Sequence, residues 1–142
     1  MKNLFLFLLL ACSSIAFGQT AVEERKNDKN YIFRDSLIID TYIICKVNIK
    51  DNSMEVIDLN HCVFTIMGNK ILLIGFVKSS IVLNIKEKHK NISENGEKTV
   101  FYICSLLSDE TETVTVMTGN TEKSGFNVFL GIFDKHYFFA EK

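Results

Sequence analysis

His61-Cys62-Val63-Phe64-Thr65-Ile66-Met67-Gly68-Asn69-Lys70-Ile71-Leu72-Leu73-Ile74 is the clearest structural pattern in the chain. Cys62, Phe64 and Ile66 recur at every second position, so they share one face of a strand. Gly68 and Asn69 then break the apolar run, and both tolerate the positive φ that a two-residue hairpin turn demands. The stretch therefore predicts two antiparallel strands joined by a tight turn.

The same two-residue period extends to other segments on both sides. Apolar and polar side chains alternate over residues 43–49, 81–86 and 114–116. Alternation of this kind places one face of a strand in the core and the other in water. Residues 71–77 are instead apolar on both faces. That run predicts a strand that is covered on both sides or faces a ligand cavity on one.

Short polar breaks separate these runs and predict turns. They occur at Asp51-Asn52-Ser53, Asn95-Gly96, Gly119-Asn120 and Asp134-Lys135. Gly, Asn and Asp are the residues that supply turn geometry in a chain without Pro. The longest break, residues 87–97, is rich in Lys, Glu and Asn and predicts an exposed loop.

We therefore predict an all-β fold, a single small antiparallel meander of about eight strands. Closure into a barrel or folding into a sandwich would both limit exposed strand edges, and the sequence does not distinguish them. The alternative is an α+β fold with a short N-terminal helix over residues 22–33. No repeat and no second domain is visible.

The N-terminus has the three-part pattern of an export signal. Lys2 precedes the apolar run of residues 4–11, and small residues follow it. Ala16-Phe17-Gly18 predicts cleavage after Gly18, so residues 1–18 are a signal peptide. The apolar run is too short to span a bilayer, which takes roughly 18 residues. We expect an exported protein, periplasmic or secreted.

A second interpretation of the same segment is a lipoprotein box. Leu9-Leu10-Ala11-Cys12 resembles the bacterial pattern in which cleavage before the cysteine is followed by its lipidation. A lipid anchor at Cys12 would change the location of the protein and leave its fold unchanged.

Composition limits the partners of the remaining chain. Residues 19–36 form a polar leader and residues 37–142 the β domain, a length suited to one core. The formal charge of the whole chain is −1, and Lys2 is the one charged residue in the signal segment. A balance this close to neutral argues against a nucleic-acid partner, which needs a concentrated basic face.

Cysteine spacing excludes two kinds of site. Cys45, Cys62 and Cys104 remain after cleavage, and no Cys-x-x-Cys pair occurs, so neither a redox motif nor a zinc knuckle is present. One disulfide plus one free thiol and three buried free thiols are both compatible with an exported protein of this size.

A metal site is the first candidate for chemistry. His61 and His136 stand at the starts of predicted strands, each with a nearby carboxylate, Asp58 and Asp134. Neutral imidazole and carboxylate are ordinary metal ligands, although these spacings match no metal motif. No Gly-x-Ser-x-Gly elbow and no Gly-rich phosphate loop occurs. We therefore expect no cofactor.

A ligand pocket is the second candidate. The aromatic residues expected to line it, if a barrel forms, are Phe76, Phe101, Phe126 and Phe129. The sequence thus favours an exported, non-catalytic binding module, whose partner is a small apolar ligand or another exported protein. One alternative is a small hydrolytic or metal-dependent enzyme that uses both histidines. A further alternative is an inhibitor or immunity-type protein.

Overall fold

A computed structural model describes residues 30–142 of the chain. The predicted signal peptide, Cys12 and most of the polar leader and of the alternative helix lie outside these residues. The described part contains a short 3-10 helix, η1 (Tyr31–Phe33), and ten strands. The strands are β1 (Ser36–Thr41), β2 (Ile43–Asn48), β3 (Ser53–Asp58), β4 (Cys62–Met67), β5 (Lys70–Ile74), β6 (Ile81–Ile92), β7 (Lys98–Leu106), β8 (Thr113–Thr121), β9 (Gly125–Ile132) and β10 (Lys135–Ala140).

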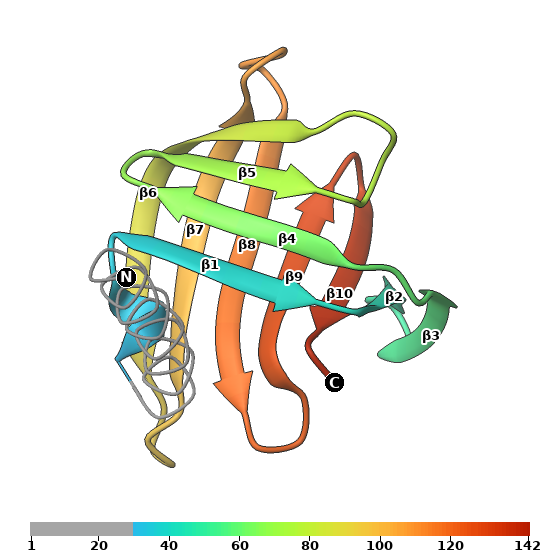
Figure 1. The fold of residues 1–142 in the computed structure, drawn as a ribbon, viewed down its shortest axis with the longest axis vertical. Helices are drawn as coiled ribbons and strands as arrows, with labels where there is room; N and C mark the ends of the chain where they lie inside the picture. The colour runs from blue at the N-terminus through green and yellow to red at the C-terminus, as the bar shows by residue number, and fades with distance from the viewer. Residues whose placement is uncertain (1–29) are drawn as a thin grey trace, which may run out of the picture. The chain divides into compact units, whose positions relative to one another are not determined.

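All ten strands belong to one antiparallel sheet that curls into a half-barrel, which confirms the all-β prediction. The order across the sheet is β1-β4-β5-β6-β7-β8-β9-β10-β2-β3. Figure 1 shows β1, β4 and β5 crossing in front of β7 to β10 at a steep angle, so the sheet folds back over its own inner face. No helix among residues 30–142 has the length and apolar character needed to cross a membrane.

β6 carries the sheet around its bend. Its first half lies beside β5 and its second half runs down beside β7 (Figure 1). The pairing with β7 slips by one residue between Ile85 and Glu87. A bulge of this kind bends a strand and increases its twist, which is what the turn from the front strands to the back strands requires.

The strand order departs from a simple meander at the link between β1 and β2, which is the single residue Tyr42. β1 ends at Thr41 and β2 begins at Ile43, yet these strands lie near opposite ends of the sheet order. The Thr41 hydroxyl donates to the Cys62 carbonyl oxygen at 3.1 Å, on the β4 side. The Tyr42 amide donates to the Ala140 carbonyl oxygen at 2.8 Å, next to β10. One bent segment thus connects the two ends of the curled sheet.

The core lies on the inner face of the sheet. Cys62, Phe64 and Ile66 are all at most 1% exposed, so the predicted face of this strand is confirmed. Val114 and Val116 are also fully buried, and the ring of Phe64 meets Phe139 edge-on at 4.9 Å. The Gly68-Asn69 hairpin joins β4 to β5, as predicted, with Gly68 at φ +57.

Four local predictions were wrong. The alternation over residues 43–49 predicted that Cys45 and Val47 face the core, but Ile44 does so instead, because it lies opposite the buried Phe139. Residues 87–92 form the second half of β6, because main-chain pairing with β7 continues out to Ile92 opposite Lys98 while most of the polar side chains face water. Gly119-Asn120 lies inside β8, paired with β9, and the turn follows at residues 122–124. The strand over 71–77 ends at Ile74, because Gly75 turns the chain at φ +97.

Candidate functional site

The imidazole of His61 pairs with a different carboxylate from the one that sequence proximity suggested. Its Nε2 lies 2.8 Å from Oδ1 of Asp40, and the Tyr42 ring stacks on it at 4.8 Å and 10°. Both members of the pair are about half exposed. Asp58 instead accepts a hydrogen bond from the Leu59 amide at 2.8 Å. His61 thus sits in a half-exposed hydrogen-bonded pair at the point where β1 meets β4.

His136 lies on β10, opposite Gly131 of β9 and Val47 of β2. Its ring lies 5.7 Å from the ring of Phe129, and Asp134 occupies the preceding turn. Within residues 30–142, no three His, Cys, Asp or Glu side chains are grouped closely enough to hold a metal ion. The metal site stays a prediction without geometric support.

The four candidate phenylalanines do not line one cavity. Phe76 makes edge contacts with Tyr137 at 4.9 Å and Phe139 at 5.2 Å, and Phe126 is 9% exposed. Phe101 and Phe129 lie on the outer face of the sheet, because their neighbours along the strands, Val100 and Val128, point into the core.

Cross-strand register instead joins the outer phenylalanines into an apolar row. Its members, each opposite the next on the neighbouring strand, are Phe101, Met117, Phe129, Phe138, Cys45 and Val56. Phe101 is 37%, Met117 40% and Val56 58% exposed, whereas Cys45, between Phe138 and Val56, is 7% exposed. We call these six residues the outer apolar row. It crosses the outside of the sheet from β7 to β3.

The row ends at β3, and β3 is an open edge. It pairs with β2 and with no other strand that the structure describes. All six of its residues are exposed, including Met54 at 61%, Val56 at 58% and Ile57 at 47%. Its sequence, Ser-Met-Glu-Val-Ile-Asp, lacks the Lys or Pro that edge strands commonly use to block further pairing.

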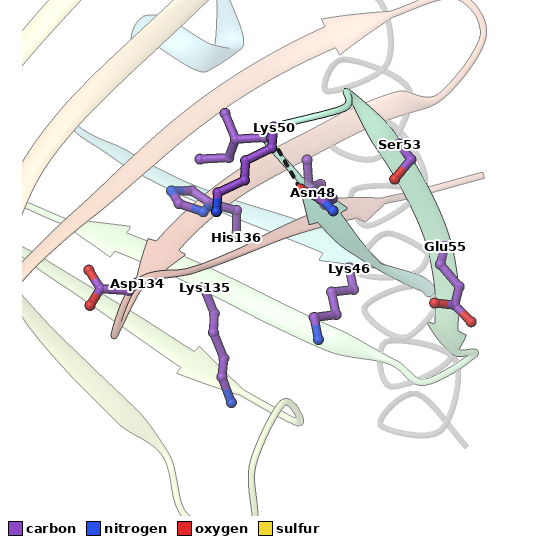
Figure 2. Close-up of a pocket in the computed structure, with 10 residues that line it drawn as sticks. Lys46, Asn48, Lys50, Ser53, Glu55, Asp134, Lys135 and His136 are labelled. Carbon is purple, nitrogen blue, oxygen red and sulfur yellow. Dashed lines mark hydrogen bonds between the residues drawn. The ribbon is translucent and has the colours of Figure 1, made fainter.

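A groove lies beside this edge, at the β2–β3 hairpin and the start of β10 (Figure 2). It has a volume of about 510 Å³ and is lined by Lys46, Val47, Asn48, Ile49, Lys50, Ser53, Glu55, Asp134, Lys135 and His136. Figure 2 shows the Lys50 side chain reaching toward His136 on one side of the strands, with Lys46 and Lys135 on the other. Three lysines against two carboxylates make this groove weakly basic.

Burial makes the described cysteines harder to ionise, because it raises the pKa of each of their thiols. Cys45, Cys62 and Cys104 are buried free thiols. Burial, with a smaller contribution from the Asp58 charge, raises the pKa of Cys62 to about 11, and burial raises the pKa of Cys104 to about 12. A thiol must ionise to act as a nucleophile, so both stay inert near pH 7.

Comparison with protein-family models, with curated proteins and with solved structures finds no match to this chain. The chemistry of the described surface is therefore the basis for a functional proposal.

Sequence reasoning missed two parts of this surface. The open edge had a weak signal, since Met54 and Val56 alternate with polar residues in a segment without Lys or Pro. The Asp40–His61 pair had none, because it arises from the register that places Asp40 opposite Val63.

Proposed function

We propose that this protein is an exported, non-catalytic protein-interaction module, and that its partner adds a strand to the open edge of β3. One observation carries the proposal: β3 presents a fully exposed edge whose apolar side chains continue the outer apolar row. Main-chain groups along such an edge supply affinity, and side chains on either face of the added strand supply specificity.

Two further observations support a protein partner over a small apolar ligand. Phe101 and Phe129 lie outside the half-barrel, where a flat macromolecular surface can cover them. The groove of Figure 2 contains several polar side chains beside the edge. An apolar core flanked by polar groups is the usual anatomy of a protein interface.

Synthetic peptides test this proposal. Fluorescent peptides with alternating β-branched residues should bind, with a rise in anisotropy, and Val56→Lys should weaken that binding. N-methylation of the amides on one edge of the peptide should abolish binding, while methylation of the opposite edge should not, because strand addition uses one edge of the ligand backbone. Equal binding by both methylated forms would contradict the proposal.

A further inference from the structure

We infer that the strand added to β3 belongs to a second copy of this chain, so that two half-barrels join into one continuous sheet across a twofold axis. This inference rests on the proposed function and names its partner. It follows from the order of residues in β3 and from the way antiparallel strands pair.

Antiparallel geometry restricts how two copies of β3 can meet. Residues that face each other across a ladder either both point their N–H and C=O groups at the partner strand or both point them away. Along β3 the N–H and C=O groups point toward and away from the open edge at alternate residues. An odd-numbered residue can therefore face only an odd-numbered residue of the other copy, and an even-numbered residue only an even-numbered one. Pairing with a long overlap is then centred on Glu55 against Glu55 or on Val56 against Val56.

The two registers differ in the charges that they place opposite each other. The first places two Glu55 carboxylates directly opposite each other, and like charges in that position are destabilising. The second places Val56 against Val56, Glu55 against Ile57 and Met54 against Asp58, so no charged side chain faces a like charge. β-branched Val against Val is also a favourable cross-strand pair. The sequence of β3 thus fits a copy of itself in one register.

The pairing closes rather than propagates. A twofold contact uses the same edge on both copies, so neither copy keeps a β3 edge for a third chain. The strand at the other end of the sheet order, β1, folds over to contact β9. Self-pairing therefore explains how a strand without Lys or Pro avoids open-ended association. In the pair, the outer apolar rows of both copies meet at Val56.

Sedimentation and light scattering of the full chain across a wide concentration range test the inference. We expect a species of twice the monomer mass. Val56→Lys, which places two positive charges opposite each other, should give a monomer, and the uncharged, β-branched Val56→Thr should keep the dimer. Ile74→Lys is the matched control, because Ile74 of β5 is 50% exposed against 58% for Val56, and this variant should also stay dimeric.

Cross-linking tests the register. Cys45 lies opposite Val56 on β2, so the test uses a Cys45→Ala background in which the new thiol has no cysteine beside it in its own chain. Under mild oxidation Val56→Cys chains should then link to each other, whereas Glu55→Cys chains should link to Ile57→Cys chains and not to themselves. Rapid self-linking of Glu55→Cys, a monomer at every concentration, or a dimer that survives Val56→Lys would each overturn the inference. A monomer that still binds the peptide probes at β3 would leave the proposed function standing. Loss of peptide binding as well would overturn both.

Discussion

The Nε2 atom of His61 lies 2.8 Å from Oδ1 of Asp40 and joins the start of β4 to β1 across the surface. The Tyr42 ring stacks on the same imidazole. Exposed pairs of this kind contribute little to stability, because water screens the charges and the side chains lose freedom in forming them.

We therefore expect a small energetic coupling between these residues. A double-mutant cycle with Asp40→Asn and His61→Gln, measured by urea unfolding near pH 6, should give about 0.2–1 kcal/mol. Peptide binding and self-association should stay unchanged in both variants. Loss of either activity would place the pair in the binding surface.

The buried hydroxyl of Thr41 should contribute more to the stability of the fold than an exposed threonine hydroxyl does. It is fully buried and donates to the Cys62 carbonyl, so Thr41→Val leaves a buried acceptor with one partner fewer. We expect the free energy of unfolding to fall by about 1–3 kcal/mol. Thr113→Val, at an exposed position of β8, is the control and should change little.

Two glycines with positive φ should respond differently to alanine. Gly75 has φ +97, and a Cβ there would collide with the His61 carbonyl oxygen, whereas Gly68 has φ +57 and open space around it. We expect Gly68→Ala to cost about 1 kcal/mol, the price of a left-handed conformation. Gly75→Ala should cost about 3 kcal/mol or more, since the backbone must also move. Equal losses in thermal unfolding would contradict this account.

The β9–β10 turn offers a stabilising substitution. Phe133 and Asp134 have φ values of +50 and +59, which a two-residue hairpin demands and which a bulky residue rarely adopts. Phe133 is also 58% exposed, so its ring contributes little packing. Phe133→Asn should raise the free energy of unfolding by about 0.5–1 kcal/mol. A fall in the melting temperature would show that the ring makes a contact worth more than the strain.

Alkaline pH should destabilise the fold through its buried thiols. Burial raises the pKa of Cys104 from 9.0 to about 12. Above pH 9 the Cys104 thiol therefore ionises in the unfolded chain while it is still protonated in the folded one. Stability is therefore complete below pH 9 and is lost as pH rises toward 12. Urea unfolding of Cys104→Ala across this range should show a shallower decline than the parent protein. An unchanged slope would assign the alkaline loss to other groups, such as Tyr102, whose pKa burial also raises to about 12.

Local patterns of apolar and polar residues were enough to predict the all-β fold, but not which strands pair with each other in the sheet. Cys62, Phe64 and Ile66 lie on a strand with a strict period of two, so their inward face could be read directly. The segment from Thr99 to Ile103 is apolar at most positions, so alternation alone could not assign Phe101 to the outside. Which strand ends at an open edge depends on pairing between distant segments. Within β3, the alternation of Met54 and Val56 with polar residues is the one weak signal of it.

The position of β2 and β3 in the sheet also sets when the proposed binding surface can exist. β2 is held by β10, so an edge encoded by residues 53–58 has no support until residues 135–140 are in place. A chain that is truncated, or still being synthesised, would lack a functional edge even with β3 intact. Pairing through β3 would therefore be open to fully folded chains and closed to incomplete ones.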